Sequence, residues 1–191
     1  MIGTDWKGIM ISVKRAVTAA VACLLTATVA GCSAGEPYGY ETPQDICGTA
    51  VEPDTIKPFL PPGMELKNLP HVPGSATSWG CNIKVDENLV LQVASDRVGQ
   101  GIDISDLAEN GSLHLRNPKS AKLEKTSQLQ IAEDGALMEI PCTGHGESYL
   151  VTKVVIGSPE HRAKSTEDQS TEIAAFLRSY VPELVKQKCD A

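Results

Sequence analysis

Aromatic residues are scarce in this chain, and basic residues are outnumbered by acidic ones. Phe, Trp and Tyr make up 4% of the 191 residues, so a folded core must consist mostly of Val, Ile, Leu and Ala. Lys and Arg number 17 against 24 Asp and Glu, which gives a net charge of −7. An acidic surface repels phosphate groups, so we expect neither nucleic acid nor anionic lipid headgroups as partners.

The chain also lacks the motifs of common nucleotide- and metal-dependent enzymes. Its sequence contains no Walker loop, no dinucleotide-binding fingerprint and no EF-hand-like acidic loop. The single match to the Gly-x-Ser-x-Gly pattern, at residues 31–35, crosses a predicted cleavage site and cannot form the strand-to-helix turn of a hydrolase. We therefore expect no catalytic residue, no cofactor and no metal, and we predict that the chain is not an enzyme.

The apolar run Ala16–Ala30 is shorter than the roughly 20 residues that a membrane-spanning helix needs. The basic residues before it are Lys7, Lys14 and Arg15, and small residues end it. This order is typical of an export signal, so we predict that residues 1–31 are a signal peptide. Translation from Met10 instead of Met1 would give a more compact signal, and the sequence leaves both starts open.

The tetrapeptide Val29-Ala30-Gly31-Cys32 resembles the lipobox of bacterial lipoproteins. The resemblance implies that Cys32 carries acyl chains such as palmitate and holds the mature protein on the extracytoplasmic face of the cell membrane. Residues 32–44, rich in Gly and Pro, would form a flexible tether, and residues 45–191 a single extracytoplasmic domain. The alternative is an ordinary cleaved signal peptide, after which Cys32 would take part in a disulfide.

Four further cysteines predict two disulfides, because an exported domain folds in an oxidising compartment. They are Cys47, Cys81, Cys142 and Cys189. Four cysteines allow three pairings, and loop-closure entropy does not select among them. We favour Cys47–Cys81 and Cys142–Cys189, which would fasten an N-terminal helix and a C-terminal helix to two hairpins.

Two hairpins and one central strand are predicted from alternating apolar residues. In the first, a loop at Asp86-Glu87-Asn88 would pair residue 85 with 89, 83 with 91 and 81 with 93. In the second, a type I′ turn at Asp134-Gly135 would pair 131 with 138 and 129 with 140, with Glu139 pointing away. The Val- and Ile-rich segment 148–156 predicts a central, largely buried strand.

Helices are predicted at both ends of the domain. Apolar residues three and four apart predict a C-terminal helix over residues 167–188, kinked or split at Pro182. Short helices are expected at Asp45 and at Pro53-Asp54, and Met64–Ser78 is expected to be irregular. The fold class is therefore α+β: an antiparallel sheet of about five strands, packed by the C-terminal helix.

Some residues are candidates for metal or ligand binding, but a structural role is favoured for each of them. Cys142 and His145 have a spacing that zinc ligands use, but a thiol in this compartment is expected to oxidise. The other histidines, His71, His114 and His161, are scattered along the chain. Lys119, Lys122 and Lys125 form a small basic cluster that is typical of a solvated face, and Trp79 beside Cys81 indicates core packing.

The chain is similar to a group of small actinobacterial membrane-anchored lipoproteins of unknown function. The likeness rests on Val29-Ala30-Gly31-Cys32, the early Cys47, the segment Glu52–Gly63, and the pair Trp79 and Cys81. It implies an α+β fold and favours the Cys47–Cys81 pairing, and it carries no catalytic residue. We therefore expect a lipid-anchored, non-enzymatic binding module at the cell envelope, with an unknown protein or small molecule as its partner. The alternatives are a carrier of a small apolar ligand between sheet and helix, and a cell-envelope hydrolase.

Overall fold

The computed structural model describes residues 38–71, 77–110, 115–143, 148–157 and 169–190. The predicted signal peptide and the predicted lipidation site, Cys32, lie outside this part of the chain. The elements are β1 (Asp45–Ile46), β2 (Thr49–Ala50), α1 (Pro53–Ile56), the 3₁₀ helix η1 (Lys57–Phe59), β3 (Leu66–His71), β4 (Ser78–Val85), β5 (Asn88–Val98), α2 (Ile104–Asn110), β6 (Lys119–Ser120), β7 (Gln128–Ile131), β8 (Gly135–Cys142), β9 (Ser148–Ile156) and α3 (Ser170–Lys188). Among these residues, no helix combines the length and apolarity that crossing a bilayer requires.

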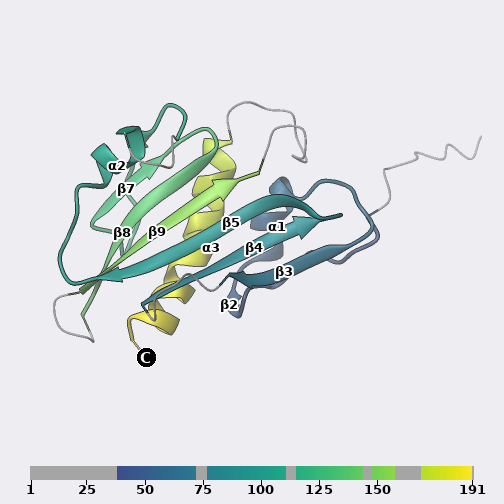
Figure 1. Cartoon of the computed structure of the whole chain (residues 1–191), viewed down its shortest axis with the longest axis horizontal. Coiled ribbons are helices and arrows are strands. Elements are labelled where there is room, and N and C mark those ends of the chain that lie inside the picture. The colour runs from purple at the N-terminus through teal and green to yellow at the C-terminus, as the bar shows by residue number, and fades with distance from the viewer. Residues whose placement is uncertain (1–37, 72–76, 111–114, 144–147, 158–168, 191) are drawn as a thin grey trace, which may run out of the picture. The chain divides into compact units, whose positions relative to one another are not determined.

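A seven-stranded antiparallel sheet forms the body of the domain, in the order β3-β4-β5-β9-β8-β7-β6 (Figure 1). The predicted α+β class is confirmed, and β9 is the central strand that the sequence predicts. The predicted number of about five strands is too low, because the two-residue β6 and the edge strand β3 were not expected. β3 lies in the segment Met64–Ser78, which was predicted to be irregular. Pro70 in this segment argues against a strand when only the sequence is known. Proline is nevertheless tolerated on an edge strand, where one side of the backbone needs no hydrogen-bond partner.

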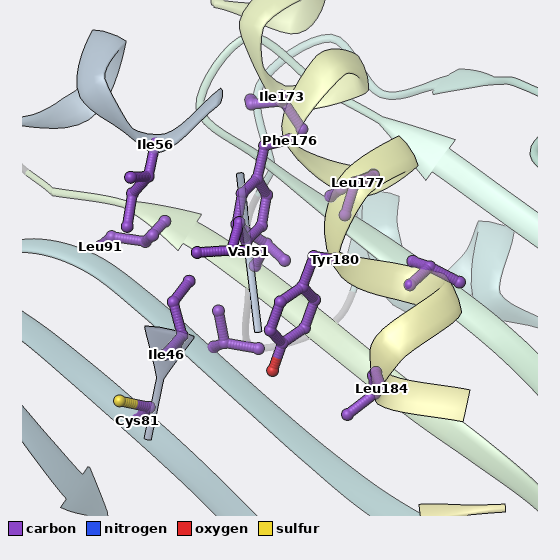
Figure 2. Close-up of a cluster of buried hydrophobic side chains, with 14 of the residues drawn as sticks. Ile46, Val51, Ile56, Cys81, Leu91, Ile173, Phe176, Leu177, Tyr180 and Leu184 are labelled. Carbon is purple, nitrogen blue, oxygen red and sulfur yellow. The ribbon is translucent and has the colours of Figure 1, made fainter. Parts of the chain in front are cut away.

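Helix α3 packs across one face of the sheet, here called the inner face (Figure 1). Its buried residues are Ile173, Phe176, Leu177, Tyr180, Val181, Leu184 and Val185, which confirms the predicted apolar stripe (Figure 2). The helix continues through Pro182 instead of splitting there. Pro182 lies on the exposed side of the helix, so water can satisfy the carbonyl group that the missing N–H leaves free.

The first predicted hairpin is β4–β5, and its register is right except next to the turn. Cys81 pairs with Val93 and Ile83 with Leu91, as predicted, whereas Val85 pairs with Asn88 instead of Leu89. The turn has two residues rather than three, because Asp86 and Glu87 both adopt positive φ, 47° and 69°. A bulge then shifts the register and buries Val90 beside Leu91.

The second predicted hairpin is β7–β8, but the predicted register is two residues off. Leu129 pairs with Met138 and Ile131 with Ala136. Because the shift is two residues, every side chain keeps its predicted face. Gly135 is not part of a type I′ turn but the first residue of β8, where an added Cβ would lie 2.4 Å from the Val154 carbonyl oxygen. Close packing, rather than turn geometry, requires this glycine.

The N-terminal part differs most from the prediction. Asp45 begins a tight β1–β2 hairpin instead of a helix, because Cys47 and Gly48 adopt left-handed φ values of 47° and 88°. The second short helix is confirmed as α1, followed by η1.

Part of the segment predicted as a tether, residues 32–44, is hydrogen-bonded to the domain. The backbone N–H of Gly39 donates to the Gly63 carbonyl at 2.7 Å, and the Tyr40 hydroxyl donates to the Pro61 carbonyl. Residues 38–44 therefore lie against the domain.

The opposite, outer face of the sheet is covered at one end by α2. Ile104 and Ala108 of this helix form a second buried cluster with Leu115, Ala132 and Leu137. Glu139 does point to this face, as predicted, but it is 3% exposed rather than solvated. Its carboxylate accepts hydrogen bonds from the Ile102 N–H (2.8 Å) and the Ser127 hydroxyl (2.6 Å). These hydrogen bonds satisfy the buried carboxylate, and the bond from Ile102 fixes the loop before α2 to β8.

Candidate functional site

A cavity of about 160 Å³ opens where β3 and β4 meet the β1–β2 turn and the last turn of α3. We call it the Trp79 pocket. Its lining residues are Ile46, Cys47, Thr49, Pro70, His71, Ser78, Trp79, Gly80, Cys81, Val93, Tyr180 and Lys188. Figure 2 shows three of them, Ile46, Cys81 and Tyr180, converging from β1, β4 and α3. Segments from both ends of the domain therefore build one pocket.

Trp79 lies on the inner face of β4, two residues before Cys81, and it packs against the core as the sequence predicts. The indole Nε1 is buried but has no hydrogen-bond partner. The Lys188 ammonium nitrogen lies 5.1 Å from the centroid of the Trp79 ring, a cation–π distance. The Trp79 ring and the Lys188 ammonium group thus form one edge of the pocket, while the indole Nε1 itself is buried.

Arg97 is a second cation near Trp79 and Lys188, although it does not line the cavity. It lies on β5 two residues beyond Ser95, which pairs with Trp79, so Arg97 and Trp79 are diagonal neighbours across the two strands. Arg97 Nη2 donates to the main-chain carbonyl of Lys188, whereas Nη1 is buried without a partner. A buried guanidinium N–H that lacks an acceptor is costly. The sequence does not point to this residue, because strand β5 and the end of α3 are far apart along the chain.

Thr49, on another wall of the pocket, begins a chain of hydrogen bonds. The Thr49 hydroxyl donates to Gln187 Oε1 at 2.6 Å, and Gln187 Nε2 donates to the Gly48 carbonyl at 3.3 Å. Burial raises the pKa of Tyr180 to about 12, although a side-chain hydrogen bond with Thr49 lowers it in part. Tyr180 is therefore a neutral phenol at physiological pH, and the wall carries no negative charge from it.

The raised pKa of Tyr180 predicts a loss of stability in alkali. The phenol ionises near pH 10 in the unfolded chain and near 12 in the folded one, so its contribution is complete below pH 10 and is lost as the pH rises toward 12. We expect this residue alone to lower the free energy of unfolding by up to about 1.4 kcal/mol per pH unit in that window. Urea unfolding at several pH values between about 9 and 12 measures the slope. Tyr180→Phe should have a flatter slope than the unmodified protein, and equal slopes would contradict the assignment.

Both disulfides that we favoured form in the structure, Cys47–Cys81 and Cys142–Cys189. The first lines the pocket and ties the β1–β2 turn to β4. Asn68 of β3 supports this turn, since its Oδ1 accepts from the Cys47 N–H (3.0 Å) and its Nδ2 donates to the Asp45 carbonyl (3.0 Å). The second joins β8 to the residue that follows Lys188. One disulfide therefore lies in the wall of the pocket, and the other lies next to Lys188, which lines it.

The described residues include one of the four histidines and one of the two candidate zinc ligands. His71 lines the pocket, while His114, His145 and His161 lie outside the described residues. Cys142 is in a disulfide, so its thiolate cannot ligate zinc together with His145. In the ranges that the structure covers, no group of three or more His, Cys, Asp or Glu side chains is placed to hold a metal ion.

The predicted basic cluster gains a member from α3. Lys119 and Arg178 line a groove of about 300 Å³ between β6 and the first half of α3. Lys122 and Arg178 line a smaller cavity beside it. These cationic side chains are exposed, so the solvated face that the sequence favours remains the simplest description.

We compared the chain with models of protein families, with curated proteins and with solved structures, and no match was found in any of the three.

Proposed function

We propose that this chain is a lipid-anchored, extracytoplasmic, non-enzymatic binding module, with the Trp79 pocket as its ligand site. The observation that carries the proposal is an open cavity whose edge is formed by the Trp79 ring and the Lys188 ammonium group. A concave site that combines apolar and aromatic walls with a few polar groups is typical of a small-molecule site. Two disulfides suit a domain that is exported to an oxidising compartment.

The alternative of an apolar-ligand carrier has weaker support. Side chains that are fully buried fill the layer between the sheet and α3, among them Phe59, Phe176 and Leu177. Ligand cavities for drug-sized molecules are roughly 300–1,000 Å³, and the Trp79 pocket is about half the lower bound. A small polar ligand fits this geometry better than an acyl chain or a sterol.

Clustering of His145 with a serine and an acid in one cleft would favour the hydrolase alternative, and His145 lies outside the described residues. The purified protein tests it directly. If it hydrolyses any member of a panel of ester, peptide and glycan substrates, and the activity stays with the protein through purification, the non-enzymatic part of the proposal fails.

The lipid anchor predicts where the protein resides. Cys32→Ala should move the protein from the membrane fraction to the soluble fraction and remove the acyl mass from the N-terminal peptide, because Cys32 supplies the thioether for the lipid. Cys23→Ala, the same substitution within the predicted signal peptide, is the matched control and should stay membrane-bound. Fractionation with mass spectrometry measures both. An unchanged membrane fraction for Cys32→Ala would refute the lipobox interpretation.

A further inference from the structure

We infer that the exposed side chains of Tyr38 and Met64, here called the Tyr38 corner, rest in the headgroup region of the bilayer that holds the lipid anchor. This inference rests on the proposed lipid anchor and adds a surface by which the domain itself contacts the membrane. The partner of the corner is the lipid bilayer, and the contact is apolar. The anchored domain then has one preferred orientation on the membrane instead of turning freely on its tether.

Tyr38 and Met64 have the most exposed large hydrophobic side chains among the described residues, with exposed fractions of 52% and 68%. They are also neighbours in space. Tyr38 forms a parallel β-bridge with Gly63, and the Gly39 N–H donates to the Gly63 carbonyl at 2.7 Å. Apolar side chains that are exposed singly are ordinary, whereas these two form one patch. Nothing in the described part of the chain covers this patch.

Hydrogen bonds and a ring contact hold the corner in this shape. The Asp86 carboxylate accepts from the Met64 N–H at 3.0 Å. The Tyr40 hydroxyl donates to the Pro61 carbonyl, and the Tyr40 ring meets Tyr38 edge-on, with centroids 5.7 Å apart. A well-bonded backbone therefore presents Tyr38 and Met64 to the outside, so their exposure is a fixed property of the folded domain.

The position of the predicted lipid decides what the corner meets. Tyr38 follows Cys32 by 38 − 32 = 6 residues. A fully extended chain advances by at most about 3.6 Å per residue, so the acylated Cys32 holds Tyr38 within about 20 Å of the membrane surface. The opposite end of the seven-stranded sheet is not confined in this way. The patch therefore lies where the chain keeps the domain closest to lipid.

The chemistry of the corner matches the interface between lipid and water. Tyrosine is enriched there, because its ring is apolar and its hydroxyl is polar, and methionine adds a flexible apolar chain. Electrostatic attraction contributes little, since Lys67 of β3 is already paired with Glu65 and Glu87. Asp86 adds a negative charge beside Met64. The contact should therefore form on zwitterionic lipid and be insensitive to salt.

Quenching of tryptophan fluorescence by brominated phosphatidylcholine tests the inference on the lipidated protein, reconstituted in phosphatidylcholine vesicles. Trp79 is the sole tryptophan after the predicted signal peptide, and the unmodified protein gives its background signal. Met64→Trp places a reporter at the corner. Leu107→Trp places one at another exposed apolar position, on α2, which packs against β7 and β8 far from β3 in the sheet (Figure 1). After background subtraction, the lipid should quench Met64→Trp at least about threefold more than Leu107→Trp, because only a reporter inside the bilayer meets the bromine atoms. Added sodium chloride should leave this ratio unchanged.

A second pair of variants tests Tyr38 itself. In the Met64→Trp protein, Tyr38→Ser should lower the quenching at least about twofold, because the ring no longer holds the corner at the interface. Leu107→Ser makes a similar change on α2 and should leave the quenching as it was. Circular dichroism checks that each variant is folded.

Two kinds of failure can be told apart. Equal quenching of the two reporters in a protein that sediments with the vesicles overturns the inference and leaves the anchor in place. Unchanged quenching after Tyr38→Ser also contradicts it. If the protein does not sediment with the vesicles, the anchor is refuted and the inference with it, and the Cys32→Ala fractionation detects that failure independently.

Discussion

Replacement of Phe176 by alanine should lower the free energy of unfolding by about 3–5 kcal/mol, one of the largest effects of a single substitution in this protein. Phe176 is fully buried at the centre of the layer between α3 and the sheet (Figure 2). Its ring meets Phe59 edge-on, with centroids 6.0 Å apart, and stacks on Tyr180 at 5.2 Å. Truncation removes both ring contacts and leaves a cavity that the disulfide-linked ends of the layer cannot close. Urea unfolding followed by circular dichroism measures the change.

Arg178→Ala provides the control for this prediction. Arg178 lies two residues further along the same helix, and its side chain is exposed, so its removal should change the stability by less than about 0.5 kcal/mol. Both variants remove a large side chain from α3. Equal destabilisation by the two would mean that the helix does not present Phe176 to the sheet.

The difference between these two positions follows directly from the sequence. Apolar residues three and four apart place Phe176 on the buried stripe of the helix and Arg178 outside it. The helix tolerates Pro182 because this residue lies on the exposed side. The alternating residues of β4 and β5 give the inner face of the sheet by the same logic. Periodicity predicts which face of an element is buried, since burial is the property that creates the pattern.

Register and edge strands could not be predicted in this way. The two-residue turn at Asp86-Glu87 requires positive φ at residues that rarely adopt it, and the bulge at Val90 compensates for the shorter turn. Strand β3 has no alternation that sets it apart, and Pro70 argues against a strand unless its edge position is known. These features depend on which strand lies next to which, and a single sequence contains no direct record of that.

The candidate site was only partly predictable. Trp79 beside Cys81 indicated a buried position, and the preferred disulfide placed Cys47 near it. Arg97 and Lys188 gave no signal, because each resembles an ordinary surface cation in the sequence. Only the fold brings the end of β5 to the end of α3, where the Lys188 carbonyl accepts from Arg97. When each residue of a site comes from a different element far along the chain, no local sequence motif marks the site.

Removal of the Cys142–Cys189 disulfide should have an effect of similar size to the loss of Phe176. The bridge closes a loop with a sequence separation of 47 residues, and the loop-closure model gives a stabilisation of roughly 4 kcal/mol for a loop of this length. Paired alanine substitution at both cysteines removes the link without leaving a free thiol. Beyond the lower free energy of unfolding, we expect faster hydrogen exchange in the last turn of α3, because the link fixes the buried Cys189 to β8.

The matched control is the same paired alanine substitution at Cys47 and Cys81. The disulfide between these two residues closes a loop with a sequence separation of 34 residues. The loop-closure model predicts nearly the same loss for it, so the two bridges differ in where exchange accelerates rather than in how much stability is lost. Without Cys47–Cys81, faster exchange should be confined to the β1–β2 turn and β3. Without Cys142–Cys189, it should be centred on the last turn of α3, where Lys188 meets Arg97. An identical exchange pattern for the two variants would show that the domain opens as one unit, and that neither bridge holds its own side of the Trp79 pocket.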